Sequence, residues 1–175
     1  METAKRIFGF FYEIIETATF SLTLVFATYL FLFQVGEVHG TSSYPTWQEN
    51  ERFITDKISY KLHSPERGDF VVIQSPRNPE IDFIKRIIGL PNETIKIAGC
   101  QVYIDKQLLA EPYLQPNTCT NRDQEKLIPS DSYFVMGYNR QNSSDSRDFG
   151  PISASSIVGK VIFRFWPMEK LGPKF

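Results

Sequence analysis

The chain divides into two parts that differ in how apolar and polar residues follow one another. Residues 17–36 are apolar or weakly polar throughout and carry no charge. A helix of roughly 20 residues is long enough to cross the hydrocarbon core of a bilayer. The lack of a polar face argues against a helix buried in a soluble core. The pattern therefore predicts a transmembrane helix at residues 17–36.

A cleaved signal peptide is the main alternative to a permanent anchor. Signal peptides have shorter apolar cores, with small residues at a cleavage site just after them. Residues 36–39 read Gly-Glu-Val-His and offer no such site, so we interpret the span as an uncleaved anchor. Lys5 and Arg6 lie in the arm formed by residues 1–16, and basic residues near a span favour the cytoplasmic side. The N-terminus is therefore expected inside the plasma (inner) membrane and residues 38–175 outside it.

Beyond the span, short runs rich in β-branched and aromatic residues alternate with turn residues, as in a β fold. Asp105 and Lys106 are expected to turn a hairpin, and the polar stretch 115–126 to be a surface excursion. Residues 38–175 are long enough to bury a core of their own. The predicted fold is mainly β, with one N-terminal transmembrane helix and one β-rich extracytoplasmic domain. Its clearest strands are predicted at 69–73, 83–88, 94–97, 101–104, 133–136 and 157–165.

Composition excludes some classes of function but does not decide whether the two cysteines form a disulfide. The formal net charge is −1, which gives no reason to expect nucleic acid as a partner. No cofactor or metal is expected, because no Cys/His cluster has metal-ligand spacing and no glycine-rich phosphate loop is present. Cys100 and Cys119 can pair in an oxidising compartment, but their spacing does not decide whether they do.

The first candidate for chemistry is Ser42, which lies shortly beyond the span. The intervening chain can carry its hydroxyl no more than about 20 Å from residue 36. The second candidate is Lys85, which shares one face of a predicted strand with two apolar neighbours, Phe83 and Ile87. Desolvation there would lower the pKa of the amine and make it a base that activates serine without histidine. Taken alone, Lys85 is also compatible with a surface lysine whose stem lies on apolar side chains while its ammonium group reaches water.

Four motifs in order behind the anchor resemble those of bacterial type I signal peptidases, the leader peptidases, and together they cover nearly the whole chain. The resemblance implies a β-rich serine endopeptidase that removes signal peptides from exported preproteins at a membrane. The motifs are Gly-Thr-Ser-Ser-Tyr-Pro-Thr at 40–46, Arg-Gly-Asp-Phe-Val at 67–71, Lys-Arg-Ile-Ile-Gly-Leu-Pro at 85–91 and Gly-Tyr-Asn-Arg-Gln-Asn-Ser-Ser-Asp-Ser-Arg at 137–147.

The resemblance also implies a role for individual residues. Ser42 is the expected nucleophile, its backbone N–H an oxyanion donor, and Lys85 the general base. Ser143 is expected to hold the Lys85 amine by a hydrogen bond. Pro45 restricts the loop that carries Ser42. The remaining expected residues are Asp145, Arg147 and Arg86 around the dyad, and Gly40, Ser43, Tyr44 and Pro45 at the substrate pocket.

The chain departs from the family pattern at three positions. Ser43 stands where the family has methionine, which lies near the substrate pocket. Tyr138 stands where the family has an aspartate that pairs with the arginine after the catalytic lysine. Asp145 is therefore the expected partner of Arg86. Gly40 stands where some relatives carry a serine that donates to the oxyanion, so another donor is needed.

Several alternatives remain at this point. A dedicated maturation peptidase with the same dyad and a catalytically silent homologue that binds exported chains both fit the motifs. His39 or His63 offers a Ser/His arrangement, and the loop at 137–150 also has the composition of a solvated turn region. Trp47 and Trp166 are expected to favour the membrane interface, so membrane lipid is an expected partner. The oligomeric state stays open.

Overall fold

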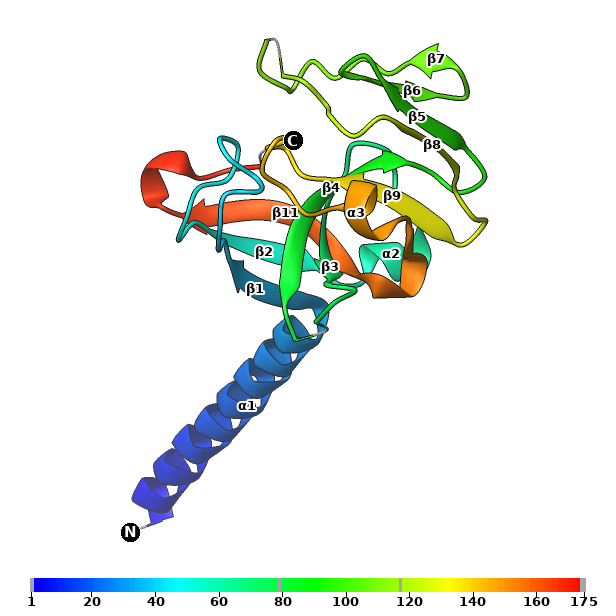
Figure 1. The fold of residues 1–175 in the computed structure, drawn as a ribbon. Coiled ribbons are helices and arrows are strands. Elements are labelled where there is room, and N and C mark those ends of the chain that lie inside the picture. The colour runs from blue at the N-terminus through cyan, green and yellow to red at the C-terminus, as the bar shows by residue number, and fades with distance from the viewer. Residues whose placement is uncertain (1, 79, 117, 174–175) are drawn as a thin grey trace.

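The structure, a computed structural model, describes residues 2–78, 80–116 and 118–173. Figure 1 shows a single long helix that leaves one end of a β-rich body. The N-terminus lies at the far end of this helix, and the C-terminal segment lies on the body. The two parts recognised in the sequence are therefore two parts in space.

Helix α1 runs over Glu2–Leu32 and carries its apolar side chains into the surroundings on all sides. Phe8 is 81% exposed and Leu22 is 72% exposed, and residues 5–32 form the one described helix long and apolar enough to cross a membrane. Hydroxyls at Thr19 and Thr23 donate to the carbonyls four residues earlier, at 2.7 and 2.8 Å. Such bonds satisfy polar groups that hydrocarbon would leave without partners, so the threonines are compatible with a span.

The helix does not have the bounds expected from the sequence. It begins near the N-terminus, and it ends at Leu32, because residues 33–36 belong to strand β1 (Phe33–Glu37). β1 pairs antiparallel with β2 (Arg52–Asp56), and the ring of Phe53 occupies the place where a side chain at Gly36 would lie. The apolar run therefore changes from helix to strand after Leu32, although its composition does not change there. Pairing with β2 determines where the strand begins. The helix passes into the body without a free linker.

Most of the body is a seven-stranded antiparallel sheet in the order β1-β2-β11-β3-β4-β9-β10. A separate sheet of four strands in the order β7-β6-β5-β8 lies at the end of the body away from α1 (Figure 1). The other strands of the larger sheet are β3 (Phe70–Gln74), β4 (Asp82–Gly89), β9 (Ser132–Met136), β10 (Ile152–Ser153) and β11 (Ile157–Trp166). Those of the smaller sheet are β5 (Thr94–Ala98), β6 (Gln101–Ile104), β7 (Gln107–Leu108) and β8 (Gln124–Leu127).

Short helices fill the connections. Helix α2 (Ser59–Leu62) follows β2, and α3 (Ser146–Phe149) leads from the loop after β9 toward β10. The 3₁₀ turns are η1 (Ala154–Ser156) and η2 (Met168–Lys170), on either side of β11. Only α3 contributes to the candidate site, because it follows directly on the loop that carries Ser143 and Asp145.

Each strand predicted from the sequence is present within one or two residues of its expected bounds. The hairpin is confirmed as well: Asp105 and Lys106 have φ of 47° and 71°, and Ile104 pairs with Gln107. Positive φ at both turn residues is the conformation that matches the twist of the flanking strands. Strand β7 is the second strand of this hairpin. Strands β1, β2, β8 and β10 were not predicted, and β8 lies partly in the expected surface excursion.

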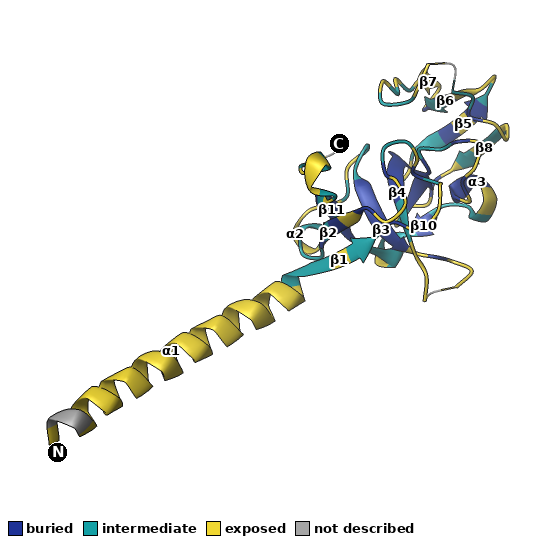
Figure 2. Ribbon diagram, turned by 90° about the vertical axis from the view of Figure 1, so that its left-hand side faces the viewer, coloured by how far each residue is buried: buried dark blue, intermediate teal, exposed yellow. Residues whose placement is uncertain are grey.

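The buried residues that the structure describes lie within the body (Figure 2) and form three clusters, one involving the smaller sheet and two on opposite faces of β3. One of these two clusters contains Phe53, Phe70 and Val72. Trp47 belongs to it, since the indole is 1% exposed and packs edge-on against Phe53 and Phe70. The expectation that Trp47 lies at the membrane interface is therefore wrong. Trp166 is 48% exposed, so its side chain remains available to such an interface.

Candidate active site

Lys85 is buried in the middle of the larger sheet. It lies on β4, pairs with Val71 of β3, and is 2% exposed. Burial lowers the pKa of its amine from 10.5 to about 8; the Asp145 carboxylate opposes this shift and the Arg147 guanidinium adds to it. Because Lys85 is buried, the alternative in which its ammonium group reaches water is wrong. A substantial fraction of this amine is neutral near physiological pH, as a base requires.

The Lys85 amine donates a hydrogen bond of 3.0 Å to the Ser143 hydroxyl. Ser143 comes from the loop between β9 and α3, far from Lys85 in sequence. The interpretation of this loop as solvated turn residues alone is wrong, because Ser143 is 8% exposed and Asp145 is completely buried. The hydroxyl therefore fixes the direction in which the lysine amine points.

The loop that carries Ser42 is tied to the loop that carries Ser143. Asn139 donates its backbone N–H to the carbonyl of Ser42 at 3.0 Å, and its side chain donates to the Thr41 carbonyl at 3.2 Å. A methyl group added at Gly137 would collide with the Ser143 hydroxyl and would lie 2.8 Å from the Ser42 carbonyl. Only glycine leaves room for these loops to meet at this point, so Gly137 allows Ser42 and Ser143 to approach each other.

Asp145 organises the second loop from inside. It forms a buried ion pair with Arg147 at 2.8 Å and accepts the backbone N–H of Gly137 at 2.9 Å. Burial alone would raise the pKa of Asp145, but hydrogen bonds from Arg147 and Gly137 outweigh it and hold the pKa below its ordinary value. The carboxylate also caps α3 through the N–H of Arg147. Asp145 thus stays ionised and holds both ends of the segment around Ser143.

The expectation that Asp145 replaces the missing partner of Arg86 is wrong. The guanidinium of Arg86 lies between two aromatic rings, 4.2 Å from the centre of Phe70 and 4.0 Å from that of Tyr113. Contacts of this kind reach about 2 kcal/mol when they are desolvated. Tyr138, the residue in the place of the family's aspartate, donates its hydroxyl to the Tyr113 carbonyl and leans on the Tyr113 ring. An aromatic cover therefore takes the place of an ion pair.

A second buried ion pair was missed in the sequence. Arg140 is 2% exposed, pairs with Glu111, and donates to Thr120 at 2.6 Å and to the Gly137 carbonyl at 3.2 Å. Glu111 and Thr120 lie in the connection from the smaller sheet, where no local pattern marks them as partners of a loop so far along the chain. This connection is therefore attached to the candidate site.

The two cysteines are joined, which settles the pairing that spacing left open. A disulfide links Cys100 to Cys119, and the next residue, Thr120, returns its N–H to the Cys100 carbonyl at 3.0 Å. Asn121 then accepts a hydrogen bond of 3.0 Å from Arg147. The disulfide thus holds the segment that contacts both Arg140 and Arg147.

Ser42 lines a cavity of about 400 Å³ together with Gly40 and Ser43. Ser43 is 4% exposed and donates its hydroxyl to the Ile84 carbonyl at 3.3 Å. A small polar residue therefore lines the cavity at the position where the family has methionine. Tyr44 and Pro45 do not line this cavity. They border a separate hollow with Gln115, Tyr138 and Arg140, contrary to their expected place in the same pocket.

The histidines do not form a catalytic pair with the serine in the part of the chain that is described. His39 lines the cavity, but its side chain is 74% exposed and lies 3.8 Å from Glu49; no hydrogen bond joins it to Ser42. His63 is exposed at the end of α2. Among the same residues, no group of three or more His, Cys, Asp or Glu has an arrangement that would hold a metal ion.

The exposed apolar helix, the antiparallel β body and the cavity-lining serine, whose loop is bonded to the loop that contacts buried Lys85, are together typical of one class: a membrane-anchored serine hydrolase. Comparison with known proteins identifies the family. Residues 11–166 match the profile described as signal peptidase, peptidase S26. The chain belongs to the signal peptidase I family of serine endopeptidases.

Signal peptidases I from several bacteria are similar to this chain over most of its length. Signal peptidase I of Leptolyngbya laminosa is 38% identical over 167 residues, which span 91% of this chain and 82% of the relative. Signal peptidase I T of Bacillus subtilis is 34% identical over 183 residues, with coverage of 97% and 93%. A crystal structure of a signal peptidase I from Enterococcus faecalis has a TM-score of 0.50 at 33% identity; the match covers 56% of this chain and 97% of that one. The predicted family, fold class and activity are confirmed.

Proposed function

We propose that Ser42 and Lys85 form the catalytic dyad of this signal peptidase. The neutral Lys85 amine takes the proton of the Ser42 hydroxyl as its oxygen bonds to the scissile carbonyl carbon. The lysine then returns that proton to the leaving nitrogen as the C–N bond breaks. Water releases the acyl group in a second step with the same proton transfers, and the Ser42 backbone N–H stabilises the oxyanion in both.

The observation that carries this proposal is the Lys85 to Ser143 hydrogen bond of 3.0 Å at a fully enclosed amine. A lysine amine has three donors on a flexible stem and can adopt many orientations. The hydrogen bond to Ser143 holds the Lys85 amine in one of them. Asp145 and Arg147 nearby largely neutralise each other, so neither charge dominates the amine. Ser143, Asp145 and Arg147 are accordingly proposed as positioning residues.

The pH dependence of catalysis tests the proposed base. With a pKa of about 8, roughly a tenth of the amine is neutral at pH 7, against less than about 0.1% for an ordinary lysine. We expect kcat/KM for a preprotein to rise about tenfold per pH unit below pH 8 and to level off above it. The rates should be measured in detergent micelles between pH 5.5 and 10. A rise that continues to pH 10 would indicate an unperturbed amine and rule out this assignment.

We also propose that α1 anchors the protein in the plasma membrane, with the N-terminus in the cytoplasm and the β body outside. The proposal is supported by the apolar exposed surface of α1 and by Lys5 and Arg6 near its start. Trp166, Met168 and Leu171 are exposed on the body and are proposed to contact lipid. Signal peptides, the substrates that the family implies, would reach the body from the same membrane.

Protease accessibility tests the topology. When protease is added outside sealed cells or right-side-out vesicles, we expect the β body to be digested and an N-terminal tag to be protected. Detergent should abolish the protection, because it removes the barrier. A protected body with a digested tag would reverse the proposed orientation. Carbonate-resistant membrane association of the full chain provides the control that the helix is inserted.

A further inference from the structure

The loop between β1 and β2 carries Ser42 and is closed at its base. There the Val38 N–H donates to the Glu51 carbonyl at 2.8 Å. Within the loop, the Trp47 N–H donates at 2.9 Å to the carbonyl of Ser43, the residue that follows Ser42. The contacts that hold Glu51 and Trp47 in place therefore also hold the backbone beside the Ser42 hydroxyl.

Arg164, on β11, contacts the part of this loop that follows Ser42. The arginine is 3% exposed, and its Nη1 donates to the Glu51 carboxylate at 2.8 Å and to the Thr46 carbonyl at 3.5 Å. Its guanidinium carbon lies 5.5 Å from the centre of the Trp47 ring. Because the guanidinium is planar and rigid, this one side chain fixes three residues of the loop relative to the sheet.

The C-terminal segment contacts both Arg164 and the loop. The backbones of Arg164 and Gly172 bond to each other in both directions at 3.1 Å, and Arg164 Nε donates to the Lys170 carbonyl at 2.8 Å. The Lys170 amine donates to the side chains of Gln48 at 2.7 Å and Glu51 at 2.9 Å. Figure 1 shows this segment, in red, beside the cyan loop between β1 and β2. Arg164 is therefore held from the side opposite the loop as well.

Glu51 is the acidic partner of both basic side chains. It is 2% exposed and accepts hydrogen bonds from Arg164 and Lys170. Burial raises the pKa of Glu51, but the bonds from Arg164 and Lys170 outweigh burial and hold the pKa below its ordinary value. A buried ion pair adds little stability beyond that of apolar side chains of similar volume, because desolvation offsets its attraction. What distinguishes the pair from apolar packing is therefore the fixed direction of its hydrogen bonds.

We propose that Arg164 is a positioning residue that holds Ser42 in its attack geometry through the three loop residues that it contacts. The inference rests on the proposed function, because the placement of Ser42 matters only if Ser42 is the nucleophile. It goes beyond that function by giving a role in catalysis to β11 and the C-terminal segment, since none of the four motifs includes Arg164. Asn139 bonds to the Ser42 carbonyl from the loop after β9, and Arg164 holds the same loop from the larger sheet.

The kinetics of Arg164→Met test the proposal. We expect kcat for a preprotein to fall about 10- to 100-fold, because a small displacement of a reacting group has an effect of this size. KM should change less than about twofold, since Arg164 does not line the cavity beside Ser42. The midpoint of the pH profile should stay near 8, because the groups that shift the Lys85 pKa are intact. The full chain should be assayed in micelles, at a temperature where circular dichroism shows each variant folded.

A double variant separates positioning from stability. Arg164→Met with Glu51→Met leaves neither member of the buried ion pair charged, so the free energy of unfolding should recover relative to Arg164→Met. The rate constant kcat should nevertheless stay low, because the contacts of the guanidinium with the loop are still missing. Arg164→Lys keeps the charge without the rigid fork and should have an intermediate kcat. These two variants also decide the question if Arg164→Met does not fold.

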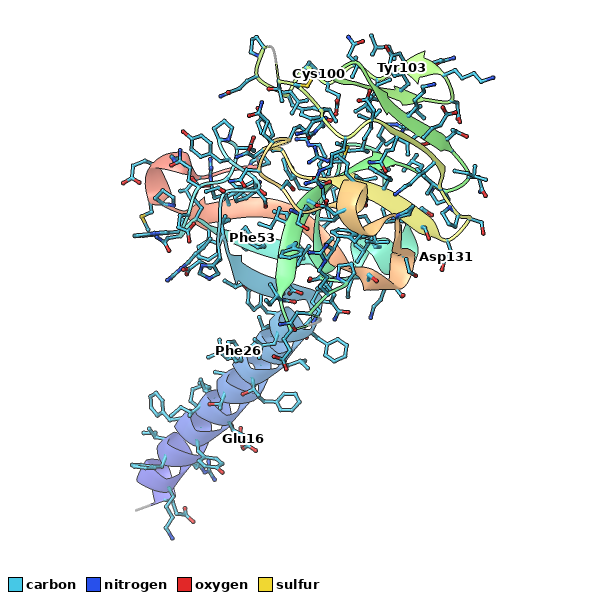
Figure 3. The ribbon with its side chains drawn as sticks, in the orientation of Figure 1. Glu16, Phe26, Phe53, Cys100, Tyr103 and Asp131 are labelled. Atoms are coloured by element: carbon cyan, nitrogen blue, oxygen red, sulfur yellow. A yellow bond between two sulfur atoms is a disulfide. The ribbon has the colours of Figure 1, made fainter. Side chains whose placement is uncertain are left out.

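The matched control removes an ion pair from the smaller sheet. Lys96→Met with Glu125→Met takes away a pair joined at 3.0 Å. Figure 3 shows Tyr103, the cross-strand neighbour of Lys96, at the end of the body away from α1. This control should keep the kcat of the wild type.

The outcomes separate the inference from the proposed function. If kcat recovers together with the free energy of unfolding in the double variant, Arg164 is only structural and the inference is overturned. A wild-type kcat in Arg164→Met, or a shifted pH midpoint, would overturn it too, and each of these results leaves the peptidase intact. If Ser42→Ala cleaves the preprotein as fast as the wild type, the proposed function fails and the inference fails with it.

Discussion

Ser42→Ala is expected to lower kcat/KM for preprotein cleavage by about four to six orders of magnitude, the range seen when a serine peptidase loses its nucleophile. Alanine removes the attacking oxygen but keeps the backbone N–H that is proposed to stabilise the oxyanion. The variant should fold, because Ser42 is only half-buried and its hydroxyl makes no hydrogen bond among the described residues. Cleavage of a preprotein by the full chain in micelles, followed by gel electrophoresis, measures the loss.

Lys85→Met should reduce the rate by a similar factor, because methionine has nearly the same length and no amine. The double variant should be no slower than either single one, since both residues act in one proton transfer. Lys61→Met, at an exposed lysine on α2, is the matched control and should retain full activity. Wild-type rates in either Ser42→Ala or Lys85→Met would exclude the dyad.

Asp145→Ala is expected to destabilise the β body by about 3–5 kcal/mol, the cost of leaving one member of a buried ion pair without its partner. The Arg147 side chain is 1% exposed and would keep its charge with no counterion, and the Gly137 N–H would lose its acceptor. Denaturant unfolding of the full chain in micelles, followed by tryptophan fluorescence, measures the change. Activity should fall with it, because Ser143 lies in the same loop.

A second substitution distinguishes charge from packing. Asp145→Ala combined with Arg147→Met should recover part of the lost stability, because no charge then stays buried. Glu125→Ala, which breaks the exposed pair with Lys96, serves as the control and should cost less than about 1 kcal/mol. A small effect of Asp145→Ala, comparable to that control, would show that water reaches Arg147 and that the loop is not held as described.

The buried carboxylate also predicts how stability depends on pH. The pKa of Asp145 is below its ordinary value in the folded protein. The unfolded chain therefore binds the proton more readily, and the stabilisation is present above the ordinary aspartate pKa. It is lost as the pH falls through the lowered value. Acid should therefore weaken the wild type and leave the stability of Asp145→Ala less affected.

Local chemistry made the strands and the hairpin predictable. Runs such as residues 69–73 and 157–165 combine β-branched and aromatic residues with flanking turn residues, and those preferences agree with their environment in the sheet. The end of the helix was not predictable in this way. Residues 33–36 continue the apolar pattern of the span, and only pairing with β2 makes them a strand.

Contacts between distant segments account for the wrong expectations. Trp47 has the composition of an interface residue, but Phe53 and Phe70 enclose it. Arg86 lacks the family's acidic partner, and the sequence offers Asp145 as a substitute; in the structure Asp145 pairs with Arg147, while Phe70 and Tyr113 enclose Arg86. In each case the partner comes from a part of the chain that no local pattern connects.

The sequence by itself determined an apolar span, a β-rich body behind it, and motifs that singled out Ser42, Lys85 and Ser143. These depend on local composition, periodicity and motif order, which can be read from the chain directly. Only the tertiary structure decided that Lys85 is buried and bonded to Ser143, that Glu111 pairs with Arg140, and that Phe70 and Tyr113 enclose Arg86. The physical reason is that burial and hydrogen-bond partners belong to pairs of segments, which folding alone brings together.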